Sequence, residues 1–248
     1  EDFIQRNIAR ASTSKRAQSR RKALEKMKPV ERPPKEGPSA AIRFDVAVTS
    51  GRKVLEAREL TIGYSSSTPL AVDLTFRIER GERIALIGPN GTGKTTLLKT
   101  IAGHLPPLSG RIRFGTGVDL DYYDQEQQAF HPEATVLEEV WNDFPSLDRT
   151  AVRSALGQFL FSGDDVFKKV ADLSGGEKAR LSLCKRMLRR ANLLLMDEPT
   201  NHLDMRSKER LEKALSEYPG TLLFVSHDRY FINRLATQVW ELTPEGIR

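Results

Sequence analysis

One eight-residue run has the residue types needed to hold phosphate groups. It reads GPNGTGKT over residues 88–95 and matches the pattern G-x-x-x-x-G-K-[ST] at every fixed position. Gly91 and Gly93 allow backbone N–H groups to turn toward phosphates, and a helix beginning at Lys94 adds the positive end of its dipole. Lys94 supplies a charge for the β and γ phosphates, and Thr95 offers a hydroxyl to Mg²⁺. The run predicts a nucleotide site, because a glycine-rich turn without a ligand would leave the lysine and the threonine without a role.

Two adjacent carboxylates follow an apolar run further along the chain. Residues 193–196 read as a buried strand, with Asp197 and Glu198 at its end. This is the arrangement of a Walker B site, in which Asp197 helps to hold Mg²⁺. A carboxylate beside the γ-phosphate, such as Glu198, can accept a proton from the attacking water or orient it. Two solvated acids at a strand end are the alternative, but together with the phosphate loop the pair predicts a Mg-nucleotide hydrolase.

A parallel α/β core is needed to position these residues. Residues 84–102 read as a strand, a glycine-rich turn and a helix, which is the start of a β–α unit. A second unit begins at 192–196, and periodic apolar residues predict a largely helical stretch over 135–190 between the two. The sequence thus predicts an α/β fold with a helical insertion. Further strands are predicted at 42–48, 54–64, 74–78, 83–87, 221–225 and 238–242, and a helix at 177–190.

A short N-terminal segment holds all of the excess positive charge. The net charge is +6, and residues 1–28 contain nine Lys or Arg against three Asp or Glu, whereas the remaining residues hold 30 of each sign. Residues 2–27 lack Pro and Gly and favour a helix whose middle has too few apolar residues to be buried. An exposed basic arm suggests contact with a polyanion; a solvated charged helix or a disordered tail is the alternative. The RNA contacts predicted in this arm are Lys15, Arg16, Arg20, Arg21 and Lys22.

Prolines separate this arm from the rest of the chain. Five Pro or Gly residues between positions 29 and 38 predict a semi-rigid linker. The predicted organisation is a basic helical segment at 1–28, a Pro-rich linker at 29–40 and a globular domain at 41–248. Its helical subdomain is predicted over about residues 130–190.

Composition excludes several classes of protein. The chain has 248 residues, of which 39% are hydrophobic, but no apolar run approaches the roughly 18 residues that span a bilayer. The one cysteine, Cys184, rules out an intramolecular disulfide and is expected to be a core residue, and no Cys/His cluster has zinc spacing. These features favour the cytoplasm. The chain opens at Glu1 with no apolar signal segment, so we expect a piece of a longer protein that extends upstream.

Further motifs make the chain resemble the ATP-binding cassette (ABC) ATPases. LSGGE at 173–177 is similar to the ABC signature, in which a serine and two glycines precede a helix and can bind phosphate. In ABC proteins the signature completes the ATP site of a facing domain, so each site is shared between two cassettes. NHLD at 201–204 resembles the D-loop, which communicates across that dimer.

Three single residues acquire roles only through this resemblance. Gln125 resembles the Q-loop glutamine that reaches Mg²⁺ and the attacking water, and His227 resembles the switch histidine that contacts the γ-phosphate. Tyr64 resembles the aromatic residue that stacks on adenine. Without the family, a glutamine or tyrosine of this kind would be read as surface or core, and a histidine after a strand as structural.

Two longer stretches resemble the ABC-F branch, whose members have two cassettes on one chain and no membrane domain. They are DEPTNHLD at 197–204 and SHDRYF at 226–231, and FLFSGDD at 159–165 is also similar. The resemblance covers roughly residues 40–243 as the second cassette. Residues 1–28 look like the end of the linker that, in ABC-F ribosome factors, reaches toward tRNA and ribosomal RNA. Because the first cassette is missing here, the expected partner is a second cassette, either in a longer chain or in a homodimer.

The resemblance implies a fold, a reaction and a set of site residues. The fold is a P-loop NTPase with an ABC core sheet and a helical subdomain, preceded by a basic α-helix, and the ligands are ATP and Mg²⁺. The expected function is ATP hydrolysis in a ribosome-binding translation factor; a DNA-structure-binding repair ATPase and the nucleotide-binding subunit of a transporter are the alternatives. The expected nucleotide contacts are Tyr64, Gly88, Pro89, Asn90, Gly91, Thr92, Gly93, Lys94, Thr95, Thr96, Ser174, Gly175 and Gly176; the metal contacts are Thr95, Gln125 and Asp197; and the catalytic residues are Glu198, His227 and Gln125.

Overall fold

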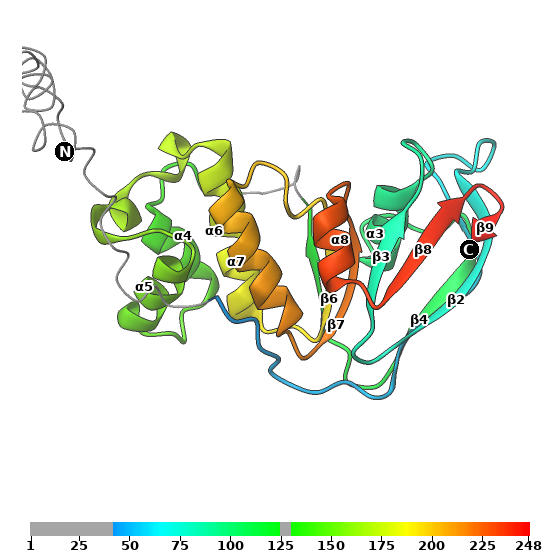
Figure 1. The fold of residues 1–248 in the computed structure, drawn as a ribbon, viewed down its shortest axis with the longest axis horizontal. Coiled ribbons are helices and arrows are strands. Elements are labelled where there is room, and N and C mark those ends of the chain that lie inside the picture. The colour runs from blue at the N-terminus through cyan, green and yellow to red at the C-terminus, as the bar shows by residue number, and fades with distance from the viewer. Residues whose placement is uncertain (1–41, 125–129) are drawn as a thin grey trace, which may run out of the picture. The chain divides into compact units, whose positions relative to one another are not determined.

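A computed structural model describes residues 42–124 and 130–248 of the chain, which belong to one compact unit (Figure 1). The predicted basic helix, the Pro-rich linker and Gln125 lie outside the described residues. Within them, two β-sheets and a helical part confirm the α/β prediction. No helix of the described part combines the length and the apolar character that a membrane span requires.

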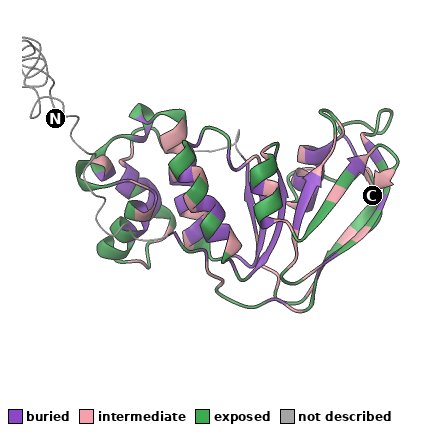
Figure 2. Cartoon of the chain, in the orientation of Figure 1, coloured by how far each residue is buried: buried purple, intermediate pink, exposed green. Residues whose placement is uncertain are grey.

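The central sheet has six strands in the order β5-β6-β7-β3-β8-β9. All neighbouring pairs are parallel except β8 and β9. In β6 and β7 every residue is buried, which explains their continuous apolar sequences, since a parallel sheet is covered on both faces (Figure 2). Residues of β6 alternate between two hydrophobic cores, one on each face of this sheet. The strands are β3 (Arg83–Ile87), β5 (Leu120–Tyr123), β6 (Leu193–Asp197), β7 (Thr221–Val225), β8 (Gln238–Thr243) and β9 (Gly246–Ile247).

A second, three-stranded antiparallel sheet has the order β2-β1-β4. Its strands are β1 (Lys53–Ile62), β2 (Ala71–Glu79) and β4 (Ser109–Phe114), of which the sequence predicted the first two. Apolar side chains of β1 and β2 share one core with the central sheet and with helix α3 (Lys94–Ile101). The antiparallel sheet therefore supports, through α3, the loop that begins that helix.

The other core joins the central sheet to the helical part. That part contains α4 (Val136–Asp143), α5 (Arg149–Gln158), two 3₁₀ turns, η1 (Gly163–Phe167) and η2 (Val170–Asp172), and α6 (Gly175–Arg189). Side-chain caps fix where α4, α5 and α6 begin, because Thr135, Asp148 and Ser174 each accept a hydrogen bond from the first turn. The core also takes in α7 (Met205–Ser216), α8 (Arg229–Leu235) and the buried Cys184, confirming the cysteine as a core residue.

One predicted strand is wrong. Residues 42–48 form no strand, although Ile42 and Phe44 are buried. Both side chains join the core of the helical part, and the Phe44 ring packs edge-on against Tyr218 with ring centroids 6.3 Å apart. The alternating apolar pattern of this segment thus reports packing against helices rather than pairing in a sheet.

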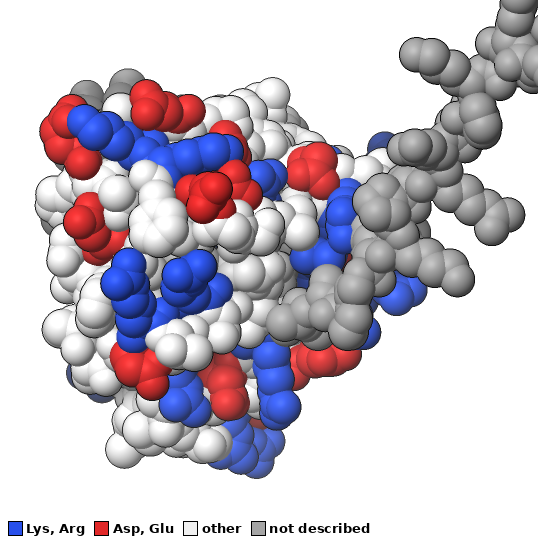
Figure 3. Space-filling model, turned by 90° about the vertical axis from the view of Figure 1, so that its left-hand side faces the viewer, with Lys and Arg blue, Asp and Glu red and all other residues white. Residues whose placement is uncertain are grey.

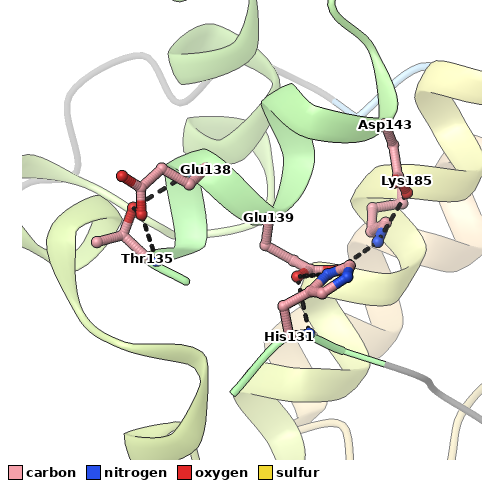
Figure 4. A network of polar contacts seen from close by, with 6 residues as sticks. All are labelled: His131, Thr135, Glu138, Glu139, Asp143 and Lys185. Carbon is pink, nitrogen blue, oxygen red and sulfur yellow. Dashed lines mark hydrogen bonds and ion pairs between the residues drawn. The ribbon is translucent and has the colours of Figure 1, made fainter. Parts of the chain in front are cut away.

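A buried carboxylate ties the helices of this part together (Figure 4). The Glu139 side chain in α4 is fully buried and lies 2.6 Å from Lys185 Nζ in α6. The same ammonium lies 2.8 Å from Asp143 at the end of α4. On the other side, the backbone N–H of His131 donates to Glu139 Oε2 at 3.0 Å, and its Nδ1 lies 3.1 Å from that oxygen. The network therefore joins α4, α6 and the chain at residue 131.

Replacing Glu139 with Ala should destabilise the fold, because it leaves the largely buried Lys185 ammonium with only one carboxylate. We expect the free energy of unfolding to fall by about 3 kcal/mol, measured by urea denaturation. The matched control is Glu133→Ala, which breaks an exposed ion pair with Lys169 and should change stability little. Equal effects of the two substitutions would show that the buried network contributes no more than a surface pair.

Candidate nucleotide-binding site

The phosphate loop connects β3 to α3 at the carboxyl edge of the central sheet. Gly93 precedes α3 with φ +95°, and a Cβ there would lie 3.1 Å from Leu70 Cβ, so the position suits glycine. At the other end of the loop, a Cβ on Gly88 would lie 2.7 Å from the Leu242 carbonyl oxygen of β8. Both glycines therefore allow the loop to wrap closely over the sheet.

Lys94 points back across this loop. Its Nζ donates hydrogen bonds to the carbonyl oxygens of Gly88 at 2.8 Å and Pro89 at 2.9 Å. Burial lowers the pKa of Lys94, and the nearby carboxylates Glu198 and Asp197 oppose that shift. A cation is thus held at the mouth of the loop, where phosphate oxygens could accept its hydrogen bonds.

The loop meets the Walker B strand at Asp197, the last residue of β6. This carboxylate is buried, and burial is the main cause that raises its pKa, with the charges of Asp124 and Glu198 adding to the rise. A hydrogen bond with the Thr95 side chain and the charge of Lys99 act in the opposite direction. A buried carboxylate beside a hydroxyl is an oxygen donor set that fits Mg²⁺, whose remaining ligands would be phosphates and water.

The sequence analysis missed two functional candidates beside Asp197, which are Asp124 and Lys99. Asp124 follows β5, which pairs with β6 so that Tyr123 lies opposite Met196, and this register brings Asp124 beside Asp197. Asp124 Oδ2 lies 3.2 Å from Lys99 Nζ in α3. The available signal was the position of Asp124 at the carboxyl end of a strand, but β5 itself was not predicted.

Glu198 and His227 meet although 29 positions separate them in the sequence. The backbone of Glu198 has φ +48°, and its N–H donates to the Val225 carbonyl oxygen at 3.0 Å. The backbone N–H of His227 donates to Glu198 Oε2 at 3.3 Å. The ring nitrogen Nε2 of His227 lies 3.4 Å from Glu198 Oε1. The Glu198 side chain is only 16% exposed, whereas that of His227 is 65% exposed. The pair offers a proton acceptor and a ring nitrogen at the edge of the site.

A cleft of about 430 Å³ collects most of the predicted nucleotide contacts. Tyr64 lies at this cleft with 72% of its surface exposed, as an aromatic ring available for stacking requires. A second cavity, of about 530 Å³, adjoins the cleft at Lys94 and His227 and also includes Gly88. The lining of the cleft includes Tyr64, Asn90, Gly91, Gly93, Lys94, Thr95, Thr96, Asp197, Glu198 and His227. Among the described residues, no three or more His, Cys, Asp or Glu side chains form a group that could hold a metal ion.

The signature residues lie elsewhere. Ser174 caps α6 in a capping box with Glu177, and neither it nor Gly175 or Gly176 lines the cleft. A Cβ on Gly176 would lie 2.8 Å from the His202 carbonyl oxygen, so the signature packs directly on the D-loop segment. Within the described residues, the structure therefore gathers the phosphate loop, the Walker B acids and His227, but leaves the signature apart from them.

Comparisons with known proteins show which family the chain resembles. The profile of a family described as ABC transporter matches residues 71–201, and a second profile with the same description matches residues 1–44. The putative ATP-binding protein YdiF of Bacillus subtilis is 56% identical over 247 residues, which are 100% of this chain and 38% of that protein. The ABC transporter F family member 2 of Arabidopsis thaliana is 41% identical over 99% of this chain and 37% of its own length.

A third relative carries a more specific name. The energy-dependent translational throttle protein EttA of Haemophilus influenzae is 41% identical over 79% of this chain and 36% of its own length. The chain thus spans well under half the length of each of these relatives. Among solved structures, a bacterial Atm1-family ABC exporter with ATP bound has a TM-score of 0.69 at 20% identity, covering 85% of this chain and 41% of the exporter chain. That likeness shows the fold alone.

Proposed function

Because the chain belongs to the ABC transporter family of ATP-binding domains and its homologues include ABC-F proteins, we propose that it is one cassette of a tandem ABC-F ATPase that binds ribosomes. In this proposal residues 41–248 are the cassette, and residues 1–28 are the end of the linker between cassettes. The observation that carries the ATPase part is the cleft in which Lys94, Asp197 and Glu198 face one another.

The chemistry proposed for the cleft divides among these residues. Lys94 and the N–H groups of the loop bind the phosphates, and Tyr64 stacks on the base. Thr95 and Asp197, with Gln125 as the family resemblance implies, would hold Mg²⁺, which neutralises phosphate charge when bound. Glu198 accepts the proton of the attacking water or orients that water, and its contact with His227 places the imidazole at the same edge.

A second cassette would complete this site. Ser174 and Gly176 stand at the N-terminus of α6, where a helix favours phosphate, yet they line no part of their own cleft. We therefore propose that they bind the ATP held by a facing cassette. ATP would close the two cassettes, and hydrolysis would reopen them.

The ribosome is the partner that best unites the remaining observations. EttA, by its name, acts on translation, and the excess positive charge of the chain is confined to residues 1–28. Basic side chains supply affinity for RNA phosphates with little sequence specificity. A cytoplasmic location follows from this proposal.

Co-sedimentation with ribosomes tests the proposal. The two-cassette protein containing this chain, with Glu198→Gln and the matching change in its first cassette, should pellet with ribosomes when ATP is present and not without it. Glutamine cannot act as the base, so the closed state should accumulate. If the protein does not pellet with ribosomes at low salt although it still binds ATP, the result would favour a DNA-structure-binding ATPase or a transporter subunit.

The basic arm makes a separate contribution in the same assay. Replacing Arg16, Arg20, Arg21 and Lys22 with Ala should weaken ribosome binding and flatten its dependence on salt, since fewer counterions are released. Measuring the bound fraction across a salt series gives the slope. An unchanged slope would show that the arm is a solvated helix with no RNA contact.

A further inference from the structure

The antiparallel sheet presents four arginines on one face. Glu56 of β1 lies opposite Arg77 of β2 and Arg113 of β4, and Arg58 lies opposite Arg111. Directly opposite residues in an antiparallel sheet point to the same side, and residues two apart along a strand return to it. All four arginines are exposed, whereas Leu55 and Ala57 on the other side are buried. We call this exposed side, defined by Arg58, Arg77, Arg111 and Arg113, the arginine face.

Carboxylates neutralise only part of this charge. Arg58 Nη2 lies 2.8 Å from Glu56 Oε1, and Arg77 Nη2 lies 2.9 Å from Glu79 Oε1. The pKa of Glu56 is lowered, chiefly by its hydrogen bond with Arg58 and further by the charges of Lys53 and Arg77. The Arg58 hydrogen bond thus holds Glu56 in its charged form, and the neighbouring positive charges act in the same direction.

The other two arginines have no acidic partner. Neither Arg111 nor Arg113 forms an ion pair with a residue in 42–124 or 130–248. They lie on β4, an edge strand in which no residue is buried. Their guanidinium groups therefore remain available to a ligand outside this unit.

The opposite end of the unit differs in charge. Figure 3 shows the side formed by the helical part, where Lys and Arg are interspersed with Asp and Glu. In the helical part, Lys168 Nζ lies 2.7 Å from Asp165 Oδ1, and Lys169 Nζ lies 2.8 Å from Glu133 Oε2. The arginine face thus carries two arginines without an acidic partner among the described residues, whereas charges of both signs are interspersed on the helical side.

We propose that the arginine face binds the phosphate backbone of RNA, as a second contact besides the basic arm; this inference rests on the proposed ribosome function. Guanidinium groups bind phosphates in a bidentate manner. On this sheet they repeat at about 5 Å across strands and about 7 Å along a strand, which suits a polyanion with regularly placed charges. Every side chain in the two opposed sets on this face is charged, so no apolar group among them could enter a lipid bilayer. The sets are Arg77, Glu56 and Arg113, and Arg58 and Arg111.

Protection of the sheet edge is the competing explanation. Charged side chains on an edge strand prevent pairing with other chains. That role predicts association of the protein when the charges are removed and no loss of RNA binding. The two roles are therefore separable by measuring both properties on one variant.

The test is RNA binding by the whole chain carrying Arg111→Ala and Arg113→Ala. The probe is a fluorescein-labelled RNA duplex of about 20 base pairs, long enough for several phosphate contacts, titrated by anisotropy over a salt series. Affinity should fall about tenfold at moderate salt, and the slope of log K against log[salt] should decrease by about 2, one for each lost phosphate contact. Arg111→Lys with Arg113→Lys keeps the charges and should retain most of the salt slope.

A matched control removes the same net charge elsewhere. Arg149 in α5 and Lys213 in α7 are both exposed, and replacing both with Ala should leave RNA affinity near that of the wild type. The outcomes that overturn the inference are distinct. Wild-type affinity in the Arg111/Arg113 variant, with loss only in the arm variant, would refute the arginine face but keep the proposed function.

Three further outcomes would also refute the inference. If the variant associates on size-exclusion chromatography while its monomer binds RNA normally, the arginines protect the edge of β4. Binding of the wild type to phosphatidylserine vesicles but not to RNA would identify a lipid surface instead. If the wild type binds no RNA even at low salt, both the proposed ribosome binding and this inference are refuted.

Discussion

Replacing Glu198 with Gln should lower the rate of ATP hydrolysis by about 10²- to 10⁴-fold while ATP still binds. The two side chains have nearly the same shape, but the amide cannot accept the proton of the attacking water. Glu198 is suited to this role because it is largely buried, lies at the cleft, and has its backbone fixed by Val225. Because Glu198→Gln removes only the base, the substitution should slow the chemical step and leave the phosphate loop intact.

Phosphate release in the two-cassette protein measures this effect, with nucleotide affinity measured in parallel. Glu217→Gln is the matched control, since Glu217 is exposed and follows α7, and it should hydrolyse ATP at the wild-type rate. Near-normal hydrolysis by the Glu198 variant would transfer the base function to another residue of the site. Loss of binding as well would mean that Glu198 has a structural role.

Replacing Lys94 with Ala should reduce ATP affinity by about 10- to 100-fold, since a hydrogen bond to a charged group contributes roughly 1.5–3 kcal/mol. The Lys94 ammonium is held over the loop by the Gly88 and Pro89 carbonyls, so it is already positioned before the nucleotide arrives. A positioned cation loses little freedom on binding, which makes its contribution to affinity larger.

Titration of the chain with a fluorescent ATP analogue measures this loss. Lys213→Ala removes the same charge at an exposed lysine of α7 that does not line the cleft, and this substitution should leave affinity unchanged. Thermal unfolding of both variants checks that the fold persists. Unchanged affinity in a folded Lys94 variant would contradict the assignment of the cleft as the phosphate site.

Short contiguous motifs indicate the chemistry proposed for this protein, and the sequence by itself was enough to predict them. The phosphate loop and the Walker B strand each consist of neighbouring residues, so their types and order specify local structure and ligand together. The predicted strands 83–87 and 221–225 coincide with β3 and β7, because fully apolar runs bounded by polar residues have few alternatives. Helix α6 was predicted from the serine and two glycines that precede it, and it begins two residues earlier than expected, directly after the Ser174 cap.

Tertiary structure alone decided which distant residues meet. The polar strand β4 has no apolar pattern to predict it and exists through pairing with β1, and the segment 42–48 has such a pattern yet packs against helices. The contact of Glu198 with His227 and the approach of Asp124 to Asp197 depend on the order of parallel strands. Strand order, like the separation of the signature from its own cleft, is set by long-range packing, and no local spacing along the chain records it.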